Sequence, residues 1–186
     1  MTDSKNRYRK LCREEETIPV FSKDWWLDAV CGENNWDVVL VEKDGKIVAS
    51  LPYKSVKKWG FSLLNMPLLT QKLGPWIYYP DQQSEYARLG YEKELLTELI
   101  SKLPRFAYFN QRFNYTITNW LPFYWKGFSQ TTMYTYYIPD ISNPEAAVEQ
   151  FSSMKKRNIR KAEKLVEIKQ DLTATAFYEH YQYCLS

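Results

Sequence analysis

The chain has 186 residues, 45% of them apolar, which suffices for one domain with a substantial core and a fragment of another. Its 25 basic and 22 acidic residues leave a net charge of only +3, which argues against a dedicated nucleic-acid-binding protein. No segment approaches the ~20 apolar residues of a membrane span, and the charged N-terminus is unlike a secretory signal, so we expect a cytoplasmic protein.

The N-terminal part of the chain predicts two helices and then a run of strands. Residues 6–15 have helical spacing, with Tyr8 and Cys12 facing inward. Ser22 is expected to cap a second helix, which Gly32 ends. Four segments rich in β-branched and aromatic residues predict strands, at residues 36–42, 46–56, 61–66 and 76–79. Asp44-Gly45 is a typical hairpin turn between the first two.

A long amphipathic helix is predicted next, at residues 84–103. Its broad apolar face carries Leu89, Leu95, Leu96, Leu99 and Ile100. Strands at residues 105–111 and 131–138 are expected on either side of a short helical turn, which ends at Gly127. Together these elements predict an α+β domain over residues 1–142, with a mixed, largely antiparallel sheet flanked by helices.

Residues 143–186 are expected to be the incomplete start of a second domain. They predict helices at residues 144–151 and 153–165, a strand at residues 166–169 and a further helix. The helix around residues 154–165 is amphipathic, with Arg157 and Arg160 on its basic face. That face is either simply solvated or binds an anion, and guanidinium groups suit phosphate or carboxylate because they bind them bidentately.

Familiar catalytic and metal-binding motifs are missing. His180 is the only histidine, so no Ser-His-Asp or Cys-His system and no HExxH motif is available. Cys12, Cys31 and Cys184 lie far apart without a C-x-x-C pair, which argues against a zinc site and a disulfide framework and favours a reducing compartment. We therefore expect no metal site, and the sequence names no catalytic residue.

Glycine-rich phosphate loops are also missing. The six glycines form neither G-x-G-x-x-G nor G-x-x-x-x-G-K-[ST]. Residues 71–76, QKLGPW, match only the first four positions of the loop by which common acetyltransferases hold coenzyme A. Pro75 lacks the N–H that such a loop uses, and Trp76 blocks the close approach that a small residue permits. We do not expect coenzyme A to bind here.

A polar and aromatic cluster follows the strand predicted at residues 105–111. Asn110 and Arg112 lie at the end of this strand, and Tyr115 comes shortly after. This combination of side chains is typical of substrate clefts. Structural packing of the aromatic residues is the alternative interpretation.

Several segments resemble FemAB-like proteins of the GNAT acyltransferase superfamily. They are IPVFSKDWWLDAV, WDVVLVEKDGKIVASLPY, LGPWIYYP and RNIRKAEKLVEIK, and ITNWLPFYWKGFSQTTMYTYYI resembles bacterial members of the same group. The resemblance implies two GNAT-like domains in tandem. This chain would then hold the first domain and the leading helix, strand and helix of the second, and most of the acyl-donor site would lie in the remainder of that domain.

The resemblance also implies a function. Family members transfer an acyl or aminoacyl group to an amine, from acetyl-CoA, another acyl-CoA or aminoacyl-tRNA, in peptidoglycan, surface-polysaccharide or lipid pathways. This chain would be the acceptor-binding half, acting on a cell-envelope precursor, and no cofactor is expected to bind to it alone. The residues expected to line the acceptor cleft are Trp26, Gln71, Asn110, Arg112 and Tyr115.

Arg157 and Arg160 are expected to meet an anionic substrate or tRNA. Two alternatives stay open. One is a GNAT-like module that binds without catalysis. The other is a nucleic-acid-binding module that uses the basic helix at residues 154–165.

Overall fold

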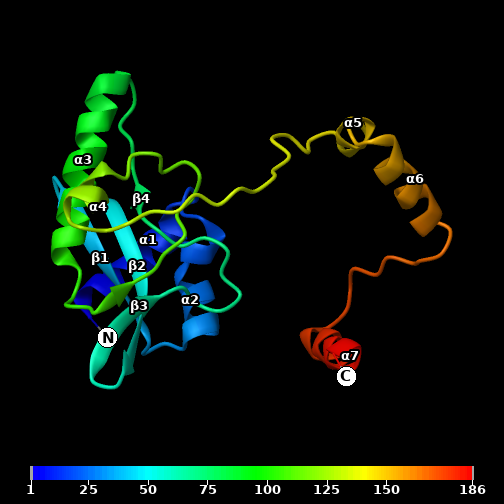
Figure 1. Ribbon diagram of the computed structural model, residues 1–186, viewed down its shortest axis with the longest axis horizontal. Coiled ribbons are helices and arrows are strands. Elements are labelled where there is room, and N and C mark those ends of the chain that lie inside the picture. The colour runs from blue at the N-terminus through cyan, green and yellow to red at the C-terminus, as the bar shows by residue number, and fades with distance from the viewer. Residues whose placement is uncertain (1, 186) are drawn as a thin grey trace. The chain divides into compact units, whose positions relative to one another are not determined.

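The computed structural model describes residues 2–185 and divides the chain into two compact units (Figure 1). The first unit extends through Thr131, and the second begins at Thr132. The sequence instead predicted a boundary between residues 142 and 143, after a strand expected at residues 131–138. The first unit contains the sheet and its flanking helices, and the second contains helices and extended segments.

Five strands of the described residues form one open sheet in the first unit. They are β1 (Trp36–Lys43), β2 (Lys46–Lys58), β3 (Phe61–Asn65), β4 (Trp76–Ile77) and β5 (Tyr108–Phe109). One edge of β2 pairs with β1, and the opposite edge pairs with β4 near its start and with β3 near its end. All of these pairings are antiparallel, whereas β5 runs parallel to β3. The predicted α+β class and largely antiparallel sheet are confirmed.

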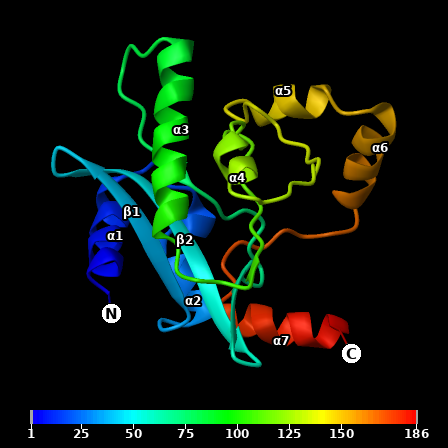
Figure 2. The ribbon, with the colours of Figure 1, turned by 60° about the vertical axis from the view of Figure 1, so that its left-hand side comes forward.

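Helices cover both faces of this sheet (Figure 2). On one face lie α1 (Asp3–Glu14), the short 3-10 turn η1 (Val20–Ser22) and α2 (Asp24–Cys31), and on the other lie α3 (Glu85–Lys102) and α4 (Leu121–Trp125). Side chains alternate along β1, so Val38 and Leu40 pack with α1 and α2 while Val39 and Val41 pack with α3. A strand buried on both faces explains the unbroken apolar run of β1.

The predicted ends of the helices agree with the structure at two positions and differ at a third. Ser84 caps α3 by accepting a hydrogen bond from the Ala87 N–H, and Gly32 ends α2 with a φ of 78°. The prediction that Ser22 caps α2 is wrong, because Lys23 occupies that position. The Ser22 carbonyl instead accepts a 2.8 Å hydrogen bond from the buried Tyr8 hydroxyl.

Two tight turns connect the first three strands. Asp44-Gly45 joins β1 to β2 with φ values of 51° and 76°, which confirms the predicted hairpin. Trp59-Gly60 joins β2 to β3 with almost the same values, 50° and 81°. Both turns have the positive φ angles of the type I′ turn, which favours Asn, Asp and Gly at its first position. A tryptophan there is unusual.

Two predictions of β-structure and one of burial are wrong. The segments at residues 131–138 and 166–169 form no strand, while the strands expected at residues 76–79 and 105–111 are present but shorter, as β4 and β5. Residues 131–138 have strong β-propensity, but no strand pairs with them in the structure, and propensity without a partner does not make a sheet. Leu89 lies on the solvent side of α3 rather than in the core.

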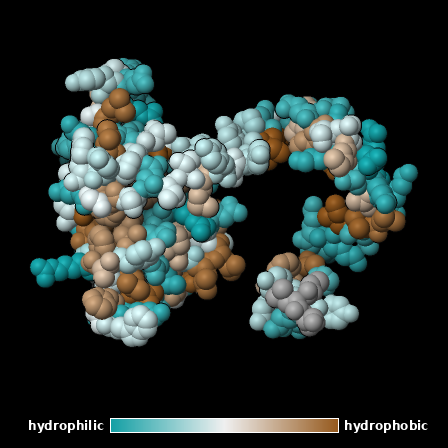
Figure 3. All heavy atoms as spheres, viewed as in Figure 1, coloured by the Kyte–Doolittle hydropathy of each residue, from teal (hydrophilic) through white to brown (hydrophobic). Residues whose placement is uncertain are grey.

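The second unit contains α5 (Pro144–Glu149), α6 (Ser153–Ala162) and α7 (Ala174–Leu185). None of the side chains described between residues 132 and 183 is buried. Figure 3 shows hydrophobic residues at the surface of both units. Those of the second unit include Met133, Ile138, Ile141, Met154, Leu165, Val166, Ile168, Leu172 and Phe177. A second GNAT-like domain therefore stays a prediction.

Two glycines test how tightly the first unit is packed. A Cβ atom on Gly74 would lie 2.5 Å from Phe113 Cδ1 and 3.2 Å from Phe113 Cα, so Gly74→Ala forces the Phe113 ring to move and crowds its backbone. We expect this substitution to lower the free energy of unfolding by about 1–3 kcal/mol.

Gly90→Ala is the matched control, because Gly90 lies in α3 with open space around its Cα. It should raise the free energy of unfolding by about 0.5–1 kcal/mol. Urea denaturation of both variants measures these changes. Equal effects of the two substitutions would contradict the packing described around Phe113.

Candidate functional site

Two segments far apart in the sequence pack together beside β3 and β5. In this loop junction, defined by residues 66–75 and 110–115, the Leu73 N–H donates a 2.8 Å hydrogen bond to the Arg112 carbonyl. The Arg112 N–H approaches Met66 Sδ at 3.4 Å, and Lys72 Nζ lies 4.8 Å from the centre of the Tyr115 ring. Arg112 and Tyr115 are thereby held against the loop that carries Gln71.

Trp26 reaches the same junction from α2. Its indole N–H donates a 3.1 Å hydrogen bond to Thr70 Oγ1, and Thr70, which is buried, directly precedes the exposed Gln71. Trp26, Gln71, Arg112 and Tyr115 are therefore positioned by one set of contacts. Neither of the two hollows described below includes them among its lining residues.

Asn110 lies at the base of the loop junction. Its N–H donates to the Leu64 carbonyl at 2.8 Å, and its side-chain amide donates to the Tyr108 hydroxyl at 3.1 Å. The side-chain amide of the neighbouring Gln111 donates a 2.8 Å hydrogen bond to the Pro52 carbonyl. This bond attaches the segment to the middle of β2.

Arg157 and Arg160 lie on α6, in the second unit, and both are exposed. The loop junction belongs to the first unit. Their neighbour Lys156 forms a 2.9 Å ion pair with Glu149, so part of the basic helix face is occupied by an interaction within the unit. The anion-binding role of the two arginines stays a prediction.

A groove of about 930 Å³ lies where α1 meets the β1–β2 hairpin and the chain that follows β4. Its lining residues include Arg7, Lys10, Leu11, Glu14, Lys43, Lys46, Trp76, Tyr78 and Tyr91. This volume is within the range of small-molecule sites, and three aromatic rings combined with charges of both signs can bind a ligand that is itself mixed in polarity. No motif in the sequence predicts the groove, because its lining residues come from four separate segments of the chain.

Several contacts hold the groove walls in place. The Trp76 indole N–H donates to Thr17 Oγ1 at 2.9 Å, and the Tyr78 N–H donates to the Val48 carbonyl at 2.9 Å. Lys43 Nζ lies 4.8 Å from the centre of the Tyr91 ring and 2.9 Å from a Glu94 carboxylate oxygen. The Tyr78 side chain is about half exposed, which leaves its ring available to a ligand.

A polar clasp, formed by Lys5, Arg9, Asp24, Asp28 and Glu33, fixes α1 to α2. Arg9 donates to both carboxylate oxygens of Asp28, at 2.6 and 2.9 Å, and also reaches Asp24 at 3.2 Å. Burial raises the pKa of Asp28, but hydrogen bonds from Arg9 and Trp36 outweigh it, so the net pKa is below the ordinary value. The clasp therefore holds a charged Asp28 and positions the α1 wall of the groove.

Lys5 is the buried lysine of the polar clasp. Its ammonium donates hydrogen bonds to the carbonyls of Glu33 and Trp36 and lies 3.9 Å from the centre of a Trp36 ring. Desolvation lowers the pKa of Lys5, which is nearly fully buried. Such a lysine, saturated by backbone acceptors and an aromatic face, has a structural role.

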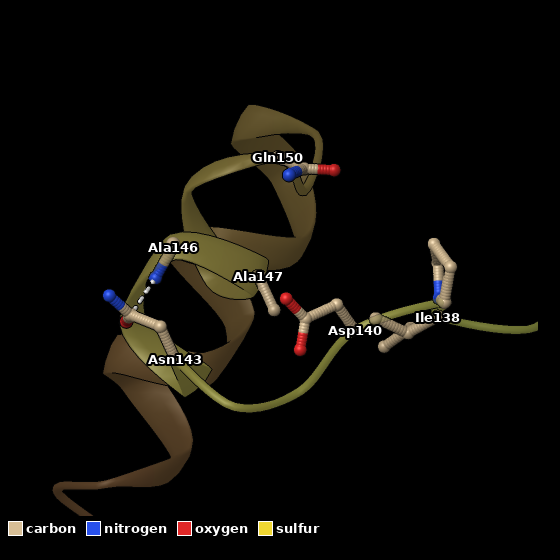
Figure 4. Close-up of a pocket in the computed structure, with 7 residues that line it drawn as sticks. Ile138, Asp140, Asn143, Ala146, Ala147 and Gln150 are labelled. Carbon is tan, nitrogen blue, oxygen red and sulfur yellow. Dashed lines mark hydrogen bonds between the residues drawn. The ribbon is translucent and has the colours of Figure 1, made fainter.

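A smaller hollow of about 120 Å³ lies in the second unit beside α5 (Figure 4). Two of its polar side chains have partners within the unit, because Asn143 Oδ1 accepts from the Ala146 N–H and Asp140 Oδ1 accepts from the Ser142 N–H. The helix beside it has only six residues. This hollow has no group that points to a ligand.

The described residues 2–185 contain no cluster of three or more His, Cys, Asp or Glu side chains that would hold a metal ion. None of the described helices is long and apolar enough to cross a membrane. Burial raises the pKa of the Cys12 thiol to about 11, so Cys12 is not a thiolate nucleophile at neutral pH.

No protein-family model, curated protein sequence or solved structure matches this chain. The resemblance to FemAB-like proteins therefore stays a prediction, and the function is argued from the groove and the loop junction.

Replacing Asp28 by Asn tests the clasp. Asp28→Asn removes the charge that Arg9 binds bidentately, and we expect the free energy of unfolding at neutral pH to fall by about 1–2 kcal/mol. Because the folded-state pKa of Asp28 is below its ordinary value of 3.8, this carboxylate stabilises the fold above that pH and loses its contribution as the pH falls further.

The difference between wild type and Asp28→Asn should accordingly shrink in acid. Denaturation as a function of pH measures it, with Asp81→Asn, a substitution of an exposed carboxylate, as the control. A difference that is independent of pH would show that charge is not what Asp28 contributes.

Proposed function

We propose that this chain supplies the acceptor-binding part of an N-acyltransferase or aminoacyltransferase that acts on a cell-envelope precursor, of peptidoglycan or of surface polysaccharide. The observation that carries the proposal is the groove of about 930 Å³, in which aromatic rings lie beside cationic and anionic side chains. Such precursors combine sugar rings with carboxylate, phosphate and amine groups, and each of these has a matching side chain in the groove.

The groove residues would divide the recognition between them. The rings of Tyr78 and Tyr91 would stack on the C–H faces of sugar rings, while Arg7 and Lys46 would bind the acidic groups. Glu14 would attract the cationic amine. Binding of this kind would orient the amine for attack on an acyl carbonyl once the amine has lost its proton to solvent, and the thiol of coenzyme A or the hydroxyl of the tRNA would leave.

The acyl donor would be acetyl-CoA, another acyl-CoA or aminoacyl-tRNA. All three are anionic, and Arg157 and Arg160 are exposed cations suited to their phosphates. Backbone N–H groups would stabilise the oxyanion formed when the acceptor amine attacks the thioester or ester carbonyl. The exposed side chains of the loop junction, Gln71, Arg112 and Tyr115, would give the acceptor a second contact surface.

Calorimetric binding of a soluble precursor tests the acceptor assignment. A UDP-linked muramyl pentapeptide is a suitable probe, with a UDP-linked amino sugar for the polysaccharide alternative. Tyr78→Ala should weaken binding about ten-fold or more, since it removes an aromatic anchor. Tyr86→Ala, which removes an exposed tyrosine of α3 outside the groove, should leave binding unchanged.

Failure of both probes to bind, or equal effects of the two tyrosine substitutions, would reject the groove as the acceptor site. A binding module without catalysis would bind the precursor in the same way but would transfer no label to it from acetyl-CoA or charged tRNA. The nucleic-acid alternative predicts instead that removing Arg157 or Arg160 lowers the salt dependence of binding by about one unit of log–log slope.

A further inference from the structure

The turn between β2 and β3 places a large aromatic side chain in an unfavourable backbone conformation. Trp59 has a φ of 50°, and such left-handed conformations are strained for bulky residues. The other hairpin of the same sheet has Asp44 at the equivalent position, with a φ of 51°. An ordinary turn residue would therefore serve here at lower conformational cost.

Packing does not compensate for this strain. The Trp59 side chain is 85% exposed, and Lys58 Nζ lies 4.5 Å from the centre of its ring. A strained tryptophan that contributes nothing to the core indicates a role outside the fold.

The tryptophan belongs to a larger apolar and basic surface, which we call the hairpin tip: Lys57, Lys58, Trp59, Phe61 and Tyr108. Phe61 is 60% exposed and Tyr108 is 51% exposed. Phe61 pairs with Lys58 across the hairpin, and Leu63, two residues further along β3, pairs with Tyr108. Since paired residues and residues two apart share a face of a sheet, Lys58, Phe61 and Tyr108 lie on the same face.

The hairpin tip projects from the rest of the sheet. The pairing of β1 with β2 ends at Trp36 and Lys54, so β2 beyond Ser55 is paired only with β3. Figure 1 shows the turn as the end of a two-stranded ribbon. The apex of the turn can therefore be buried in a partner without a change in the core of the first unit.

The charge around the tip is one-sided. The chain has no acidic residue between Asp44 and Asp81, a stretch that includes β2, β3 and β4, and none between Glu98 and Asp140, a stretch that includes β5. Lys57 and Lys58 are exposed and take part in none of the ion pairs found among the described residues. All charged residues in the strands that form the tip are thus basic, which suits an anionic partner.

We propose that the hairpin tip docks the protein on an anionic lipid bilayer. Trp59 and Phe61 would enter the interface between headgroups and acyl chains, where aromatic rings are favoured. Lys57 and Lys58 would reach back to the anionic headgroups along their aliphatic stems. A bilayer fits better than a nucleic acid because the most exposed group is an apolar apex with the cations behind it. This proposal is independent of the acceptor groove.

Sedimentation of the intact chain with lipid vesicles tests the proposal. We expect binding to vesicles of phosphatidylcholine with phosphatidylglycerol and much weaker binding to phosphatidylcholine alone. Trp59→Asn should weaken binding at least about ten-fold by removing the aromatic apex, while Lys57→Gln with Lys58→Gln should weaken it about thirty-fold. Added salt should weaken wild-type binding and affect the double lysine variant less.

Two measurements make the result specific. Trp59→Asn should unfold at the same or a higher temperature than wild type, because Asn suits the turn, so lost binding cannot be ascribed to misfolding. Trp125→Asn, which removes an exposed tryptophan of α4, should bind vesicles like wild type. No sedimentation with anionic vesicles, or equal sedimentation of wild type and Trp59→Asn, would overturn the proposal.

Discussion

Strand β2 is the element on which the rest of the first unit depends. It pairs with β1 on one edge and with β4 and β3 on the other, and Ala49, Leu51 and Tyr53 join the core beneath α3. Each functional candidate is attached to a different part of it. The groove uses its first residues, the loop junction bonds to the Pro52 carbonyl through Gln111, and the hairpin tip is its far end.

Elements with a local signal were predictable from the sequence. Gly32 and Ser84 end or begin their helices through contacts within one turn, and Asp44-Gly45 needs no distant partner. The prediction of a strand at residues 131–138 was wrong because a strand depends on a distant partner. Its Tyr and Thr content favours extended backbone, but a strand also requires a neighbour of the right register, which local sequence does not encode.

The candidate site divides in the same way. Arg112 and Tyr115 were predicted from side-chain chemistry, and Trp26 and Gln71 followed from the family resemblance. The structure brings the four together because loops 66–75 and 110–115 pack on each other. The groove could not be predicted from the sequence, because its walls come from α1, the β1–β2 hairpin, the chain after β4 and α3. Their proximity follows from the register of the sheet and from the clasp around Arg9, which pattern reasoning does not reach.

The central claim is that the stability of the chain resides in the sheet around β2, while the described side chains of the second unit form no buried core. Hydrogen exchange on the intact chain tests this most directly, because protection reports local opening free energy. The account predicts slow exchange at the β2 amides paired with β1, and fast exchange throughout α5 and α6, where no side chain is buried. Protection of α6 equal to that of β2 would contradict it.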